Sequence, residues 1–322
     1  MIEVENLSVT YKSKHRVPVT AVRNVSFTIH DNEFVGLVGE SGCGKSTLGY
    51  AMANLLDDVH HDIKGRVLLD GTDLLSLPEK KMRLLRWAKI AVVLQGGMNA
   101  FNPVIKLKHQ FMDGMKAHTK MTKAEMGHRI TSLLELVKLE PEVADMYPHE
   151  LSGGMKQRAA IALALSLNPE VIIMDEPTTA LDVVVQHSIV NTLTSLQRQL
   201  KFSVLFITHD LGVVLEAANK IMVMYAGQTV EHNSAEEILK HPRHPYTEAL
   251  MGCYVDPQSD NIQLSGIPGA PPDLSLALSG CPFAPRCTKV FDTCLTVTPP
   301  NTETTEGSVL CHLYSKEGVP QS

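Results

Sequence analysis

Eight consecutive residues, Gly39-Glu-Ser-Gly-Cys-Gly-Lys-Ser46, fit the pattern G-x-x-x-x-G-K-[ST]. The glycines allow the backbone to curve so that successive N–H groups converge on a polyphosphate, and a helix starting here adds the positive end of its dipole. Lys45 is expected to reach the β- and γ-phosphates, and the Ser46 hydroxyl is expected to ligate Mg²⁺. The pattern predicts a nucleoside triphosphate site. The alternative interpretation is a glycine-rich turn with a solvated lysine.

Four further polar residues, Gln95, Asp175, Glu176 and His209, each follow a short apolar run by one or two positions. If these runs are parallel strands, their carboxyl ends meet at one edge of the sheet, beside the phosphate loop. Asp175 is expected to hold Mg²⁺ directly or through water, and Glu176 could polarise an attacking water. Taken singly, the acidic pair could instead cap a helix, and His209 could be structural.

The elements that must position these groups alternate along the chain. Short apolar runs predict buried strands at residues 34–38, 90–94, 171–174 and 204–207. Helices are predicted to follow at residues 45–55, 154–167, 182–200 and 210–218, and the pattern between 104 and 150 is helical without strong strands. The sequence therefore predicts an α/β fold with a largely parallel sheet covered by helices and a helical insertion.

Composition excludes several classes of protein. Of the 322 residues, 44% are apolar and 20% are charged, an ordinary globular mixture. The net charge of −6, with no basic tract, argues against binding nucleic acid. The longest near-continuous apolar run, residues 159–167, is far shorter than the ~20 residues that span a bilayer. No signal peptide is recognisable, so we expect a cytoplasmic protein.

The C-terminal part differs in composition. Half of the 18 prolines lie from Pro257 onward, and four of the six cysteines lie in the last 42 residues, with the spacing C-x5-C-x6-C-x16-C. In a reducing compartment such thiols more often hold metal than form disulfides. The set suits iron–sulfur or zinc, but it lacks the tight C-x2–4-C pair of most structural zinc sites; unliganded thiols remain the third interpretation. The four are Cys281, Cys287, Cys294 and Cys311.

A second glycine-rich segment, Leu151-Ser-Gly-Gly-Met-Lys-Gln-Arg158, precedes the acidic pair and opens a predicted helix. With it, the ordered set of motifs resembles the ATP-binding subunit of ABC transporters. The resemblance implies a head-to-tail dimer in which Ser152, Gly153 and Gly154 bind the ATP held by the opposite subunit. It also implies an α/β P-loop NTPase domain over residues 1–235, with a helical subdomain at about 100–165, and an extension over 236–322.

The resemblance assigns roles to individual residues. Tyr11 would stack on adenine, Glu176 would be the general base, His209 would contact the γ-phosphate, and Asp182 would contact the partner subunit. Gln95 would sense the γ-phosphate and complete the Mg²⁺ site with Ser46 and Asp175. The remaining ATP-binding residues would be Ser41, Gly42, Cys43, Gly44, Lys45 and Thr47.

Two C-terminal sequence segments resemble one particular branch of the ABC transporter ATPases. Pro271-Pro-Asp-Leu274 and Cys281-Pro-Phe-Ala-Pro-Arg-Cys287 closely resemble the D-type ATPase of dipeptide/oligopeptide importers, which usually pairs with an F-type subunit. In that group the four cysteines can hold a [4Fe–4S] cluster, with zinc as the alternative. Two positions depart from the common pattern of ABC transporter ATPases. Met155 stands where glutamine is commoner, a variant that resembles the peptide-importer branch, and no acidic residue follows soon after Gln95.

The function implied is ATP hydrolysis that powers import of dipeptides or oligopeptides. The implied partners are a second ATPase subunit, two transmembrane permease subunits and an extracellular substrate-binding protein. The implied location of the chain is the cytoplasmic face of the membrane. Related systems carry oligosaccharides or nickel chelates. A non-transport ABC ATPase acting on DNA, chromosomes or ribosomes is the competing class. The cysteines could also regulate the ATPase.

Overall fold

The computed structural model describes residues 1–13, 16–97, 100–253, 266–304 and 307–315. Its main sheet has eight strands in the order β11-β12-β10-β9-β3-β8-β7-β6. The five strands from β9 to β6 are parallel. They are β9 (Lys220–Tyr225), β3 (Phe34–Val38), β8 (Ser203–Ile207), β7 (Val171–Asp175) and β6 (Ile90–Val93). Their short, continuous apolar sequences are buried because helices or a second sheet cover both faces.

The remaining three strands of this sheet are antiparallel: β10 (Gln228–Ser234), β12 (Ser308–Leu310) and β11 (Asn301–Glu303). The last two belong to the C-terminal extension, so the main sheet continues through the predicted boundary at residue 235. The segments 254–265 and 316–322 of the predicted extension lie outside the described residues.

A second sheet of four antiparallel strands has the order β2-β1-β4-β5. Its strands are β1 (Ile2–Ser13), β2 (Arg16–Ile29), β4 (His61–Leu69) and β5 (Thr72–Asp73). The prediction of a largely parallel sheet was therefore wrong for this part of the chain. These strands alternate buried and exposed residues, a pattern that suits a sheet covered on one face and that short apolar runs do not reveal.

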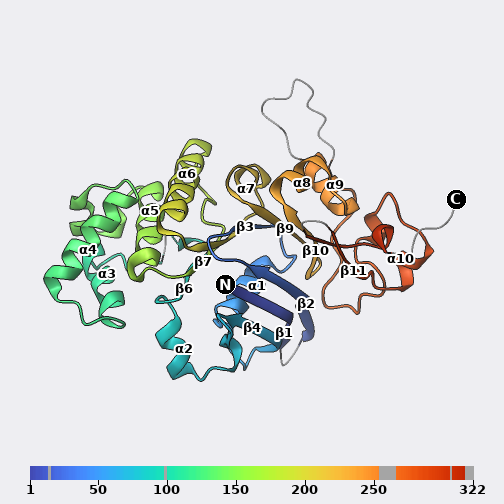
Figure 1. Ribbon diagram of the computed structural model, residues 1–322, viewed down its shortest axis with the longest axis horizontal. Helices are drawn as coiled ribbons and strands as arrows, with labels where there is room; N and C mark the ends of the chain where they lie inside the picture. Colours follow the sequence, from blue (N-terminus) through green and yellow to red (C-terminus); the bar gives the residue numbers. More distant parts are fainter. Residues whose placement is uncertain (14–15, 98–99, 254–265, 305–306, 316–322) are drawn as a thin grey trace.

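Helices surround the main sheet and extend beyond it. In Figure 1, α3 and α4 lie at one end of the long axis, and α10 and β11 lie at the other. The helices are α1 (Lys45–Met52), α2 (Glu79–Leu85), α3 (Leu107–Lys116), α4 (Lys123–Leu136), α5 (Gly153–Ala164), α6 (Val183–Leu200), α7 (Leu211–Ala217), α8 (Ala235–Lys240), α9 (Pro245–Gly252) and α10 (Asp292–Thr296). Among the described residues, none of them is both long and apolar enough to cross a bilayer.

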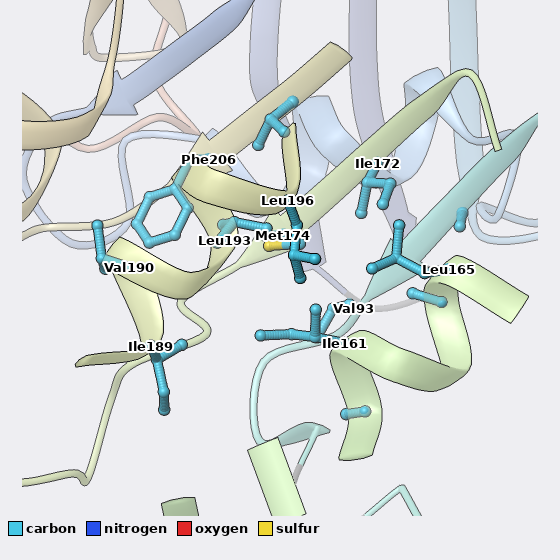
Figure 2. Packing of buried hydrophobic residues seen from close by; sticks show 14 of the residues in the cluster. Val93, Ile161, Leu165, Ile172, Met174, Ile189, Val190, Leu193, Leu196 and Phe206 are labelled. Carbon is cyan, nitrogen blue, oxygen red and sulfur yellow. The ribbon is translucent and has the colours of Figure 1, made fainter. Parts of the chain in front are cut away.

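Two apolar cores hold the layers together. One joins the second sheet, α1 and one face of the main sheet. The other lies on the opposite face, where α5 and α6 pack on β6, β7 and β8 through residues such as Ile161, Leu193 and Met174 (Figure 2). Because α1 is buried on one side and β3 is buried on both, the loop between them is held firmly.

The four predicted strands are confirmed to within one residue at each end. The predicted helices also form, with shorter ends. The first stops at Met52 rather than at residue 55, and the second ends in a 3₁₀ turn over Leu165–Leu167. Asp182 and Asp210 precede their helices as N-caps, because each side chain accepts backbone N–H bonds of the first turn.

Candidate functional site

The phosphate loop connects β3 to α1. Gly44 is the N-cap of α1 with φ 109°, a conformation that residues with a side chain rarely adopt. A Cβ at this position would overlap the carbonyl oxygen of Ala21 on β2. The neighbouring sheet therefore confines the loop from one side, and only glycine fits there.

A cleft of about 370 Å³ opens over this loop. It brings together most of the residues predicted to bind ATP, namely Tyr11, Ser41, Gly42, Gly44, Lys45, Ser46, Thr47, Gln95 and Glu176. Val19, Ala21 and Leu274 complete its lining, and the sequence analysis missed these three. Leu274 comes from the C-terminal extension, which therefore reaches the nucleotide cleft.

The buried carboxylate of Asp175 lies at the base of α1. Its Oδ1 accepts a hydrogen bond from Ser46 Oγ at 2.9 Å, and its Oδ2 accepts one from Tyr50 Oη at 2.6 Å. Tyr50 was also missed, although it lies four residues after Ser46 and hence on the same face of the helix. Hydroxyl and carboxylate oxygens are ligands that Mg²⁺ accepts, so Ser46 and Asp175 fit such an ion.

The Glu176 carboxylate contacts two of the other residues at strand ends, Gln95 and His209. Its carboxylate accepts hydrogen bonds from Gln95 Nε2 at 3.2 Å and Thr179 Oγ1 at 2.9 Å, and His209 Nδ1 lies 3.2 Å from it. The backbone of Glu176 has φ 46°, an unusual value for a non-glycine residue, and such strain is common at functional sites.

The environment of Glu176 keeps it ionised. Partial burial favours the neutral form, but hydrogen bonds from Thr179 and His209, with the positive charges of His209 and Lys45, outweigh it and lower the pKa. A carboxylate that is ionised and held at the rim of the cleft can orient a water molecule and accept its proton.

Lys45 is buried against its own loop. Its Nζ donates to the carbonyl oxygens of Gly39 at 2.7 Å and Glu40 at 3.0 Å. Cys43 does not line the cleft, because its thiol is buried beneath the loop and its N–H donates to the Glu40 carbonyl. Any contact of Cys43 with a nucleotide would therefore involve its backbone only.

Tyr11 lies at the opposite rim, on β1. Its hydroxyl is 2.8 Å from Thr47 Oγ1, and its ring packs edge-on against His61 with 4.7 Å between ring centroids. The residue is 36% exposed, which leaves part of the ring available to a base.

The second glycine-rich segment lies apart from this cleft. Ser152 is the exposed N-cap of α5, and its Oγ accepts the Met155 N–H at 3.3 Å. Gly153 and Gly154 follow in the first turn of the helix. Asp182 is likewise an exposed N-cap and accepts the Val185 N–H at 3.0 Å. The structure therefore does not bring these four residues to the chain's own nucleotide cleft.

The four C-terminal cysteines line one small cavity, together with Phe283, His244 and His312. Burial raises the pKa of Cys281 and of Cys311 to about 11. The Lys289 N–H donates to Cys287 Sγ at 3.3 Å. Within the described ranges, no group of three or more His, Cys, Asp or Glu residues is arranged to hold a metal ion.

The parallel sheet, the glycine-rich loop and the strand-end carboxylates define a P-loop nucleotide-binding protein. Residues 22–179 match the family described as "ABC transporter", and residues 230–294 match "Oligopeptide/dipeptide transporter, C-terminal region". A dimeric post-hydrolysis structure of the ATP-binding cassette MJ0796 with ADP and Pi is similar, with a TM-score of 0.65 and 29% identity, over 73% of this chain and 99% of that one.

Curated relatives match nearly the whole chain. The dipeptide transport ATP-binding protein DppD of Caldanaerobacter subterraneus is 41% identical over 99% of this chain and 98% of its own length. The oligopeptide transport ATP-binding protein OppD of Salmonella typhimurium is 40% identical over 93% of this chain and 89% of its own. AppD of Bacillus subtilis is 39% identical over 100% and 99%. The chain therefore belongs to the ATP-binding proteins of ABC transporters, which hydrolyse ATP, and within them to the dipeptide/oligopeptide transport group.

Proposed function

We propose that this chain powers the import of dipeptides or oligopeptides, with ATP closing a pair of nucleotide-binding domains and hydrolysis reopening it. The observation that carries the proposal is the 41% identity to a dipeptide transport ATP-binding protein over 99% of the chain. The match of residues 230–294 to a peptide-transporter C-terminal region supports peptides rather than oligosaccharides or nickel chelates.

At the nucleotide cleft, the loop N–H groups of residues 41–47 and Lys45 would bind the phosphates, and Tyr11 would stack on adenine. Ser46, Gln95 and Asp175 would hold Mg²⁺, Asp175 most simply through water because Ser46 and Tyr50 already occupy its oxygens. Glu176 would act as general base and His209 would contact the γ-phosphate. The shared contacts of Gln95 and His209 with Glu176 support this assignment.

The exposed caps Ser152 and Asp182 would meet a second ATPase subunit. Their distance from the chain's own cleft is what a head-to-tail dimer requires, since each subunit would complete the other's site. A solved relative is described as dimeric, with ADP and Pi bound. The partner would be a paralogous F-type subunit.

For the domain organisation, we propose a nucleotide-binding domain over residues 1–235, a helical subdomain at about 100–165 and the extension over 236–322. The position of α3 and α4 at one end of the molecule supports their assignment as the subdomain that meets the permease (Figure 1). Two permease subunits and an extracellular binding protein would complete the importer, with this chain on the cytoplasmic face of the membrane.

The cysteine cavity would hold a [4Fe–4S] cluster, with one zinc ion as the alternative. Four thiols around one cavity and an N–H donor to Cys287 Sγ suit a four-thiolate ligand set. When bound, the cluster would cross-link the segments that carry Cys281, Cys287, Cys294 and Cys311. Anaerobic purification with iron, sulfide and zinc assays distinguishes four irons per chain from one zinc.

The test of transport uses the chain assembled with its permease and binding-protein partners in proteoliposomes. ATP-dependent uptake of a labelled dipeptide and of a labelled pentapeptide is compared with that of a labelled oligosaccharide and a nickel chelate. We expect uptake of a peptide and none when Glu176→Gln replaces the wild-type chain. Uptake of only the sugar or the chelate would refute the peptide assignment while leaving the ATPase assignment intact.

A further inference from the structure

A buried ion pair connects the C-terminal extension to the phosphate loop. Arg286 Nη1 donates to Glu40 Oε2 at 2.7 Å, and Arg286 Nη2 donates to Glu40 Oε1 at 2.9 Å. Glu40 is the second residue of the loop, whereas Arg286 directly precedes Cys287, 246 positions later in the chain. The arginine side chain is only 5% exposed and the glutamate side chain 24%.

The remaining contacts of Arg286 leave none of its five N–H donors without an acceptor. Nε donates to the Pro268 carbonyl at 2.8 Å, Nη1 donates also to Tyr225 Oη at 3.2 Å, and Nη2 donates also to the Ile267 carbonyl at 3.3 Å. Only a planar guanidinium satisfies this geometry, and a lysine does not. The hydrogen bonds that Arg286 donates to Glu40 hold the pKa of Arg286 above its usual range, so the cation is permanent.

The backbone of Glu40 is held as tightly as its side chain. Its N–H donates to Tyr246 Oη at 2.9 Å, and its carbonyl accepts from Lys45 Nζ at 3.0 Å. The next residue, Ser41, lines the cleft. An unpaired carboxylate at position 40 would therefore add a negative charge to the phosphate loop itself, next to a residue that lines the cleft. Charges act over about 8 Å at physiological ionic strength.

A negative charge at that place opposes the binding of a polyphosphate, and Arg286 cancels it. We propose that Arg286 is a positioning residue for nucleotide binding, which neutralises Glu40 and fixes the loop so that it accepts phosphates. The inference rests on the proposed placement of the phosphates on residues 39–46. It makes the C-terminal extension part of the nucleotide site.

A separate contact supports this view of the extension. Arg23 Nη2, from β2, donates to the carbonyl oxygen of Leu274 at 3.0 Å, and the Leu274 side chain lines the cleft beside Val19 and Ala21. The extension thus touches the nucleotide site at two places, one apolar and one charged. A tail that served only to attach the cysteine cavity would need neither contact.

The experiment measures dissociation constants for MgATP and MgADP by calorimetry in wild type, Arg286→Gln, Glu40→Gln and the double variant. Glutamine is used because it keeps volume and hydrogen-bonding capacity in a buried position. For Arg286→Gln we expect MgATP to bind roughly tenfold more weakly than to wild type, and MgADP binding to weaken by a smaller factor. Both losses of affinity should be smaller at high salt, because salt screens the charge of Glu40. The KM for ATP should rise with little change in kcat. Glu40→Gln should bind MgATP at least as tightly as wild type, and the double variant should return to within about twofold of it.

Lys240→Ala is the matched control, because it removes an exposed ion pair of the extension, with Glu236, that reaches neither the loop nor the cysteine cavity. It should leave both dissociation constants unchanged.

Three outcomes would overturn the inference: equal losses of affinity for ATP and ADP in Arg286→Gln, no recovery of ATP affinity in the double variant, or weaker ATP binding in Glu40→Gln. If Arg286→Gln does not fold, the Glu40→Gln result alone still shows whether a negative charge at position 40 weakens MgATP binding. Lys45→Ala tests the proposed placement of the phosphates. If Lys45→Ala binds ATP as tightly as wild type, that placement is wrong. If Lys45→Ala binds ATP weakly but Arg286→Gln binds it as wild type does, only the role of Arg286 is refuted.

Discussion

The nucleotide cleft and the cysteine cavity are built in opposite ways. The cleft is open, and its polar groups come from the ends of parallel strands whose positions the sheet determines. The cavity is small and lies among loops and short helical turns, and burial there raises the pKa of Cys281 and Cys311 to about 11. A sheet can therefore hold charged groups ready for a ligand, whereas loops need side-chain anchors to form a site.

The anchors of the cysteine segment are aromatic and cationic. Phe283 is buried and packs edge-on against Tyr225 and Tyr246, with ring centroids 5.3 and 5.4 Å away. Arg286 lies 5.8 Å from the centroid of the Tyr225 ring while it binds Glu40. These contacts attach the segment between Cys281 and Cys287 to the end of β9 in the main sheet and to α9.

The largest expected effect is a loss of ATP turnover, and it distinguishes the hydrolysis step from nucleotide binding in the cleft. Glu176→Gln should lower ATP turnover at least about 100-fold, because the amide cannot accept a proton from water. MgATP binding should stay within about twofold of wild type. Turnover is measured as phosphate release and binding by calorimetry. The control is Glu216→Gln, an exposed carboxylate paired with His187, and normal turnover in Glu176→Gln would remove this residue from its proposed role.

The next prediction concerns the cavity alone. Cys311→Ser should remove most of the bound metal, because serine oxygen is a poor substitute for thiolate. Iron, sulfide and zinc are assayed after anaerobic purification, alongside calorimetry of MgATP binding. Cys253→Ser is the control, since Cys253 does not line the cavity. If Cys311→Ser retained its full metal content, the four-thiolate assignment would be wrong.

The phosphate loop offers a smaller but sharper comparison between two glycines. Gly44→Ala should destabilise the protein by about 3 kcal/mol, since its Cβ overlaps the Ala21 carbonyl at a strained φ. Gly42→Ala has φ 79° but open space around its Cβ, so only about 1 kcal/mol of backbone strain is expected. Urea unfolding gives both values. Equal losses would show that backbone conformation, rather than contact with β2, restricts the loop.

The last prediction is a pH dependence of stability that arises from two buried histidines. Burial lowers the pKa of His232 to about 4 and that of His244, which lines the cavity, to about 3. The unfolded chain, with histidine pKa near 6.5, binds these protons more tightly. Stability is therefore complete above pH 6.5 and falls as the pH drops toward 4, by about 2 kcal/mol per histidine at pH 5. Glu231, whose pKa burial raises, acts in the opposite direction.

Urea unfolding midpoints at pH 7.5, 6 and 5 test this dependence, and His232→Gln should flatten it. A stability that does not change between pH 7.5 and 5 would mean that neither histidine is kept neutral by burial.

Much of this protein could be predicted from short-range patterns. The phosphate loop, the four central strands and the residues that follow them depend on local sequence, because a buried parallel strand is a short apolar run and a phosphate loop is a compact turn. Cysteine spacing likewise indicated that the four thiols belong together, and they line one cavity. The antiparallel second sheet escaped prediction, because half-buried strands alternate apolar and polar residues.

Only the tertiary structure decided which distant residues meet. No local pattern links Glu40 to Arg286, places Leu274 in the nucleotide cleft, or shows that Tyr50 shares the Asp175 carboxylate with Ser46. Nor does local sequence show that the extension adds β11 and β12 to the edge of the main sheet. Local patterns define the elements and the chemistry they carry, whereas long-range contacts depend on how packing of the apolar faces brings those elements together.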